Sequence, residues 1–104
     1  MIAVLPSFVV GVCLSCGDGL RCADLSYDID SLDPAFAPGT GTLEVGGLTV
    51  WQGLEIIRGL AGLDLVGADL VEVSPPYDMA GTTALTAANF LYEMLCVLPG
   101  VKRG

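Results

Sequence analysis

Two carboxylates stand one residue apart at the end of an apolar stretch. In "LSYDIDSLDPAFAPGTGT", residues 25–42, Asp28 and Asp30 follow residues that alternate as in a strand. Because side chains alternate along a strand, both are expected on the same side of the backbone. Two carboxylates at the carboxyl end of a strand suit hard cations such as Mg²⁺ or Mn²⁺. Asp33 precedes Pro34 and is expected to cap the turn through its own side chain.

A third carboxylate ends a second apolar stretch. Glu72 lies in "LDLVGADLVEV", residues 63–73, which predicts a strand that is apolar on both faces in its later part. Such a strand is usually central and parallel, with helices on both faces. Its carboxyl end, like that of the predicted strand 23–28, is where open α/β sheets bind ligands. The alternation alone does not distinguish this role from that of a strand-end acid facing solvent.

Two helices are expected around these strands. The first begins at Thr49, where Thr49 and Gln52 can form a capping box, and it carries one apolar face. The second, which Thr82 or Thr83 can cap, is apolar nearly all round and predicts a buried layer or a subunit contact. The order strand, loop, helix, strand, loop, helix is half of a doubly wound α/β unit.

Composition limits the class of protein. The chain has 104 residues, the size of one domain, and its 12 acidic and 4 basic residues argue against nucleic-acid binding. No apolar run reaches the ~18 residues needed to cross a bilayer, so no membrane partner is expected. Histidine is absent, which excludes Ser-His and Cys-His nucleophile pairs. A mean hydropathy of +0.70 exceeds what a small domain readily buries, so the excess apolar surface is expected to need a membrane, another subunit or a missing part of the same domain.

Other roles for the acidic turn can be weighed against a metal site. An EF-hand loop starting at Asp28 needs Gly at position 6 and Glu at position 12, where this chain has Asp33 and Gly39. A haloacid dehalogenase-type phosphotransferase also places Asp-x-Asp after an apolar strand. That family prefers Thr or Val at the position of Leu32, and it needs a downstream Lys that only Lys102 could supply. A solvated turn without a cation is the remaining alternative for the three residues "DID".

Residues 23–103 resemble the C-terminal part of the ureohydrolases, the arginase and agmatinase family, and look most similar to animal-type agmatinases. "SYDIDSLDPAFAPGTGT" matches the family's third metal-binding signature at every fixed position, and "GGLT", "GLEIIRGL" and "DLVEVSPPYD" follow in the family's order and spacing. The resemblance implies a C-terminal fragment of the three-layer α/β/α arginase-like fold with a parallel sheet. It divides the chain into an unplaced apolar segment, 1–22, and a partial ureohydrolase domain, 23–104.

The resemblance also implies manganese-dependent hydrolysis of a linear guanidino compound, in which agmatine gives putrescine and urea. Two Mn²⁺ ions of the family share a hydroxide that attacks the guanidinium carbon. Asp28 would bridge both metals, Asp30 would bind one of them, and Glu72 would receive the guanidinium. Homo-oligomers and, for animal members, a mitochondrial location are further implications, with the cytoplasm as the alternative.

The chain departs from the family pattern in ways that bear on activity. Leu43 stands where the family has Pro, and the signatures Gly-Gly-Asp-His and Asp-Ala-His-x-Asp, which supply the histidine ligands, are absent. Two carboxylates and water cannot tightly hold two Mn²⁺ ions with about six ligands each. We therefore expect a catalytically incomplete fragment. The alternative is a truncated, non-catalytic isoform that associates with full-length ureohydrolase subunits.

Overall fold

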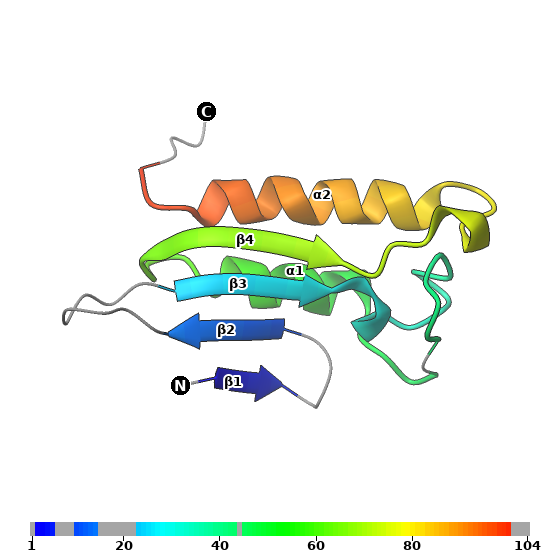
Figure 1. The fold of residues 1–104 in the computed structure, drawn as a ribbon, viewed down its shortest axis with the longest axis horizontal. Helices are drawn as coiled ribbons and strands as arrows, with labels where there is room; N and C mark the ends of the chain where they lie inside the picture. Colours follow the sequence, from blue (N-terminus) through cyan, green and yellow to red (C-terminus); the bar gives the residue numbers. More distant parts are fainter. Residues whose placement is uncertain (1, 6–9, 15–22, 44, 101–104) are drawn as a thin grey trace.

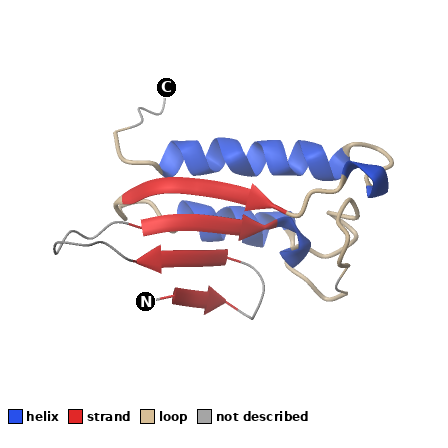
Figure 2. Cartoon of the chain, viewed as in Figure 1, coloured by secondary structure: helices blue, strands red, loops and turns tan. Residues whose placement is uncertain are grey.

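The computed structural model describes residues 2–5, 10–14, 23–43 and 45–100. Figures 1 and 2 show a twisted sheet with two helices beside it. The strands follow one another across the sheet in chain order and are β1 (Ile2–Leu5), β2 (Val10–Leu14), β3 (Ala23–Asp28) and β4 (Leu65–Val71). The helices are α1 (Val50–Arg58) and α2 (Thr82–Val97), with short 3₁₀ turns η2 (Ile29–Ser31) and η3 (Pro75–Tyr77).

The two strands that carry the predicted site pair in parallel, as their order in the chain predicts. Tyr27 is opposite Leu70 and Asp28 is opposite Val71, so β3 and β4 end at the same edge of the sheet. β1 and β2 pair antiparallel, and β2 runs antiparallel to β3, so the described sheet as a whole is mixed. Both of these strands lie in the segment 1–22, to which the sequence assigned no structure.

The expectation that β4 is central and covered on both faces is wrong for the described residues. β4 is an edge strand, and both helices lie on one face of the sheet. The side chains explain why. The opposite face of the parallel pair presents Asp24, Ser26 and Asp69, which are exposed, and the Ser26 hydroxyl donates to Asp69 over 2.6 Å. This polar face does not require an apolar cover, whereas the face of Leu25 and Tyr27 is fully buried.

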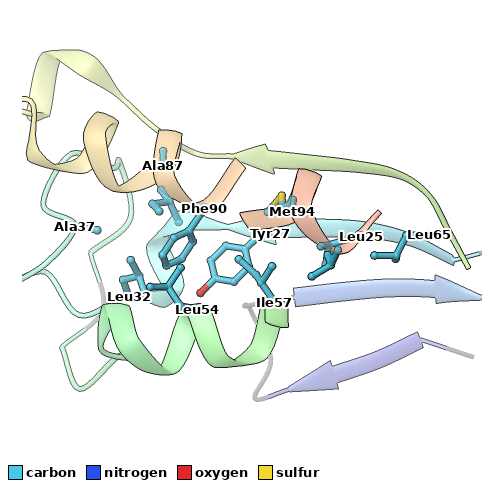
Figure 3. Packing of buried hydrophobic residues seen from close by; sticks show 12 residues of the cluster. Leu25, Tyr27, Leu32, Ala37, Leu54, Ile57, Leu65, Ala87, Phe90 and Met94 are labelled. Atoms are coloured by element: carbon cyan, nitrogen blue, oxygen red, sulfur yellow. The ribbon is translucent and has the colours of Figure 1, made fainter. Parts of the chain in front are cut away.

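The core lies between that buried face and the two helices (Figure 3). Tyr27 of β3 and Phe90 of α2 are fully buried, and their rings meet edge to face with centroids 5.0 Å apart at 87°. Gly53 of α1 lets this aromatic pair approach the helix, because a Cβ there would lie 2.6 Å from the Tyr27 hydroxyl. Ile57 and Leu54 extend the same apolar face of α1, as its helical spacing predicts.

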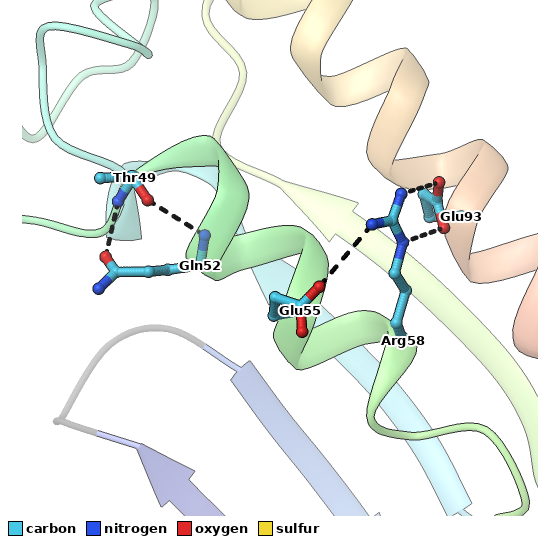
Figure 4. Close-up of polar contacts among 5 residues, drawn as sticks. All are labelled: Thr49, Gln52, Glu55, Arg58 and Glu93. Atoms are coloured by element: carbon cyan, nitrogen blue, oxygen red, sulfur yellow. Dashed lines mark hydrogen bonds and ion pairs between the residues drawn. The ribbon is translucent and has the colours of Figure 1, made fainter.

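The predicted capping box of α1 is confirmed (Figure 4). The Thr49 hydroxyl accepts from the Gln52 backbone N–H at 3.1 Å, and the Gln52 side chain accepts from the Thr49 N–H at 3.0 Å. At the other end of α1, Arg58 donates two hydrogen bonds to Glu93 of α2, with its Nη2 2.9 Å from Oε1. This paired contact fixes the end of α1 against α2.

The start of α2 differs from the prediction. Its N-cap is Gly81, with a left-handed backbone at φ 71°, and neither threonine caps the helix. Instead, the Asp78 carboxylate accepts from the backbone N–H groups of Thr83 and Ala84 at 3.0 and 2.9 Å. The Thr83 hydroxyl accepts from the Gly39 N–H at 2.8 Å and so joins the start of α2 to the loop after β3. These partners are far apart in sequence, so the capping pattern could not reveal them.

Asp78→Ala is expected to lower the melting temperature, because two N–H groups of the first helical turn lose their carboxylate acceptor. Those hydrogen bonds hold the pKa of Asp78 below its ordinary value. The stability they provide is therefore lost as the pH falls through that lowered pKa. Thermal unfolding of Asp78→Ala and of Asp64→Ala, a change at an exposed carboxylate, measures the effect. Equal melting temperatures for the two variants would show that the cap is unimportant.

Candidate metal centre

The three predicted carboxylates meet at the carboxyl edge of the parallel pair. Asp28 is the last residue of β3, Asp30 lies in the following turn η2, and Glu72 comes directly after β4. The negative charges of Asp30 and Glu72 both act on Asp28. The parallel register therefore brings together residues that are more than forty positions apart in the chain.

The local reason for the Asp28–Asp30 pairing differs from the predicted one. Strand alternation does not extend to Asp30, because the strand ends at Asp28 and a 3₁₀ turn begins. The Asp28 Oδ1 accepts from the Asp30 backbone N–H at 3.1 Å and caps this turn. Aspartate favours such local caps over continued strand structure. The turn still leaves the two carboxyl groups close enough for the charge of Asp30 to act on Asp28.

The surroundings of Asp28 disfavour the ionised form of its carboxyl group. The pKa of Asp28 is raised from 3.8 to about 6, and partial burial is the largest cause. The neighbouring carboxyl group of Asp30 and the charge of Glu72 add to the rise, whereas the hydrogen bond from the Asp30 backbone opposes it. The physical causes are desolvation and like charge, both of which favour the protonated form. In the metal-free chain a proton thus relieves the repulsion between neighbouring carboxylates. A dication in the same place would relieve the same repulsion.

The backbone at Glu72 is unusual. Its φ is +73°, the single positive value among the non-glycine residues that the structure describes. A glutamate in the left-handed region costs about 1–3 kcal/mol, and such residues occur where the surrounding structure imposes them, often at functional sites. The positive φ turns the chain sharply where β4 ends. Strand periodicity contains no signal for this feature, because it predicted that the strand would continue to residue 73.

The loop that follows the acidic turn is tied back to it. The predicted role of Asp33 is confirmed, since its Oδ1 accepts from the Ala35 N–H at 2.9 Å; its Oδ2 accepts from the Gly46 N–H at 2.9 Å. Thr42 also reaches back, and its hydroxyl donates to Asp30 Oδ2 over 2.5 Å. No helix or strand pattern in the sequence pointed to Thr42, although its place at the end of the loop's Gly-Thr-Gly-Thr run could have suggested a role.

The donor set can be compared with the needs of Mn²⁺. Asp28 and Asp30 offer carboxylate oxygens, the ligand type that Mn²⁺ prefers, and their mutual repulsion favours a cation between them. The described residues nevertheless contain no group of three or more His, Cys, Asp or Glu side chains placed to hold a metal ion. The two aspartates therefore fit as part of a manganese site, and the described chain does not complete one.

The raised pKa predicts how stability depends on pH. Because the folded-state pKa of Asp28 lies above its ordinary 3.8, this group contributes stability below about pH 4 that is lost as the pH rises through about 6. The difference between 3.8 and about 6 corresponds to about 3 kcal/mol, which solvent screening of this partly buried group reduces to about 1 kcal/mol.

Asp28→Asn should remove that pH dependence. We expect its melting temperature to exceed that of the wild-type chain at about pH 7 and to approach it at about pH 4. Asp24→Asn changes an exposed carboxylate on the same strand, and its melting temperature should equal that of the wild type at both pH values. A wild-type chain that gains stability relative to Asp28→Asn on moving to neutral pH would contradict the expectation.

Comparison with known proteins places the chain in a family. The model of the arginase family matches residues 15–96. Guanidinobutyrase of Pseudomonas aeruginosa is 72% identical over 79 residues, which cover 76% of this chain and 25% of that protein. Mitochondrial agmatinase of Gallus gallus is 69% identical over 78 residues, or 75% of this chain and 23% of that protein.

A solved structure of a hypothetical agmatinase from Burkholderia thailandensis is similar with a TM-score of 0.71 and 56% identity, over 76% of this chain and 25% of that one. The chain thus spans about a quarter of the length of these relatives. Neither helix in the described part of the chain has the length and apolar character to cross a bilayer. The family-model match, the sequence identity to these relatives and the matching fold show together that this chain belongs to the arginase family, the ureohydrolases.

Proposed function

We propose that this chain supplies part of the active site of a manganese-dependent ureohydrolase that acts on a linear guanidino compound such as agmatine. The observation that supports the proposal is that Asp28, Asp30 and Glu72 lie at one edge of the sheet, where burial and then the neighbouring negative charges raise the pKa of Asp28. Asp28 and Asp30 would hold the metal, and Glu72 would receive the guanidinium group by charge-assisted hydrogen bonds. When bound, Mn²⁺ supplies a water of lowered pKa as the nucleophile.

The names of the relatives support a guanidino substrate and leave more than one compound open. One relative is a guanidinobutyrase and another an agmatinase, so the proposed class comprises linear guanidino amines and acids. For agmatine the products would be putrescine and urea. The agmatinase of Gallus gallus is named mitochondrial, which supports a mitochondrial location as part of the same proposal.

The proposed active site can be tested by a chimera. Residues 23–98 of this chain would replace the matching segment of the Pseudomonas aeruginosa guanidinobutyrase, which is 72% identical over the aligned region. We expect Mn²⁺-dependent urea release, which Asp28→Asn abolishes and Asp69→Asn, on the same face of the sheet, leaves in place. A chimera that folds and binds Mn²⁺ but releases no urea would refute the proposal. Rates with agmatine and guanidinobutyrate would then assign the substrate.

The isolated chain is expected to be inactive, because its two aspartates cannot complete a two-metal site and it contains no histidine. Incubation of the purified 104-residue chain with Mn²⁺ and agmatine, followed by a urea assay, measures this. Urea release that depends on Asp28 would contradict the expected inactivity.

A second candidate function is association with full-length ureohydrolase subunits. Its motivation is the outer face of α2, where Leu85, Tyr92 and Leu95 are 73%, 63% and 56% exposed at helical spacing. Co-expression with the full-length guanidinobutyrase should then recover both chains on affinity purification. Replacing the three residues by Glu should abolish recovery. A wild-type chain that recovers no partner would remove this function.

A further inference from the structure

The two proposed metal ligands are held in different ways. Asp28 ends a strand that is paired on both sides, and its carboxylate is fixed by the N–H of Asp30. Asp30 lies two residues beyond the end of the strand and is only half-buried. A side chain in that position needs another contact to keep a single orientation, because ordering a partly exposed carboxylate costs conformational entropy.

Thr42 provides such a contact. Its hydroxyl donates to Asp30 Oδ2 over 2.5 Å, across twelve positions of the chain. A hydroxyl that donates to a carboxylate at this short distance forms a charge-assisted hydrogen bond, which is stronger than a neutral one. The bond engages one carboxylate oxygen and restricts rotation of the group.

The loop carrying Thr42 is fixed on both sides of it. Before Thr42, Gly39 donates to the Thr83 hydroxyl and its carbonyl accepts from the Ser74 N–H at 2.7 Å. After Thr42, the Gly46 N–H donates to Asp33, which lies three residues after Asp30. The hydroxyl of Thr42 is therefore presented by a segment with its own anchors, so the position of the donor does not depend on the Asp30 contact alone.

We infer that Thr42 is a positioning residue for Asp30: its hydroxyl orients the carboxylate for metal binding. The inference rests on the proposed function, in which Asp30 is a manganese ligand. Partners that orient a ligating side chain typically change metal affinity about 10- to 100-fold when removed. Because the chain carries only part of a site, its Mn²⁺ affinity is weak, and the effect is measured as the ratio between variants.

The test compares Thr42→Val, which removes the hydroxyl and keeps the shape, with Thr42→Ser, which keeps the hydroxyl. Mn²⁺ binding to each 104-residue chain is measured by the loss of the free-ion electron paramagnetic resonance signal. We expect Thr42→Val to weaken binding about tenfold or more and Thr42→Ser to retain it. Thr86→Val, whose hydroxyl bonds within α2, should bind Mn²⁺ as the wild type does.

A second readout needs no metal. Three-bond couplings report whether the Asp30 side chain keeps one χ1 rotamer, and we expect one rotamer in wild type and Thr42→Ser but averaging in Thr42→Val. Equal Mn²⁺ affinity or equal couplings in all three chains would overturn the inference, as would a Thr42→Ser chain as weak as Thr42→Val. If the wild-type chain binds no Mn²⁺ at Asp28 and Asp30, the metal role of both residues fails, and with it the proposed function.

Discussion

Phe90→Ala is expected to lower the free energy of unfolding by about 3–5 kcal/mol, the range for truncating a large buried side chain. Phe90 is fully buried and makes the edge-to-face contact with Tyr27 that joins α2 to β3. Its loss removes apolar burial, leaves a cavity and removes an aromatic pair worth about 0.5–1.5 kcal/mol beyond burial. Small domains are stable by only about 5–15 kcal/mol, so the variant approaches the unfolding threshold.

Tyr92→Ala is the matched control for that change. Tyr92 is an aromatic residue of the same helix, but it is 63% exposed, and surface substitutions usually stay within about 0.5 kcal/mol. Chemical denaturation of both variants, followed by circular dichroism, gives the comparison. Similar losses for the two variants would mean that α2 does not pack through Phe90.

Gly53→Ala should also destabilise the chain, although alanine is the better helix former. The propensity gain is about 0.5–1 kcal/mol, but the added Cβ would lie 2.6 Å from the Tyr27 hydroxyl and 2.8 Å from Phe90 Cζ. Both rings are fully buried and have no room to withdraw. Overpacking of this kind costs about 1–3 kcal/mol, so the clash outweighs the propensity gain.

Gly59→Ala separates the two effects. Gly59 caps the same helix with right-handed helical backbone at φ −66°, and its Cβ would meet only the last carbonyls of α1, at 3.2 Å or more. We expect this variant to match or slightly exceed the wild type in denaturation midpoint. A Gly53→Ala chain that gains as much stability as Gly59→Ala would show that α1 does not lie against the Tyr27–Phe90 pair.

The elements of this fold that follow local rules could be predicted from the sequence. Thr49 and Gln52 predicted the start of α1 correctly, because a capping box involves only two residues that are three positions apart in the sequence. Contacts between distant segments could not be predicted in this way. The cap of α2 comes from Asp78, which lies outside the helix. The position of β2 depends on pairing with β3, and that of β1 on pairing with β2. The polar outer face of β4 was missed because its pattern was judged without its neighbour β3.

For the candidate site, the sequence pointed to three carboxylates that the fold places at one edge of the sheet, but strand alternation is an incomplete reason for their grouping. Asp28 and Asp30 come together through a cap and a 3₁₀ turn rather than through strand alternation. Glu72 lies at the same edge because the parallel register aligns the ends of β3 and β4, which depends on tertiary structure. The positive φ of Glu72 has no signal in the sequence. Thr42 was overlooked because a hydroxyl acting on a ligand twelve residues away follows no helix or strand periodicity.

The central claim, that Asp28 and Asp30 form part of a manganese site, is tested most directly by paramagnetic broadening. Mn²⁺ is added to the isotopically labelled 104-residue chain, and the loss of amide signals is mapped along the sequence. We predict that broadening centres on residues 28–30, 42 and 72, and that the double variant Asp28→Asn, Asp30→Asn loses it. Broadening spread evenly over the exposed carboxylates, or unchanged in the double variant, would contradict the claim.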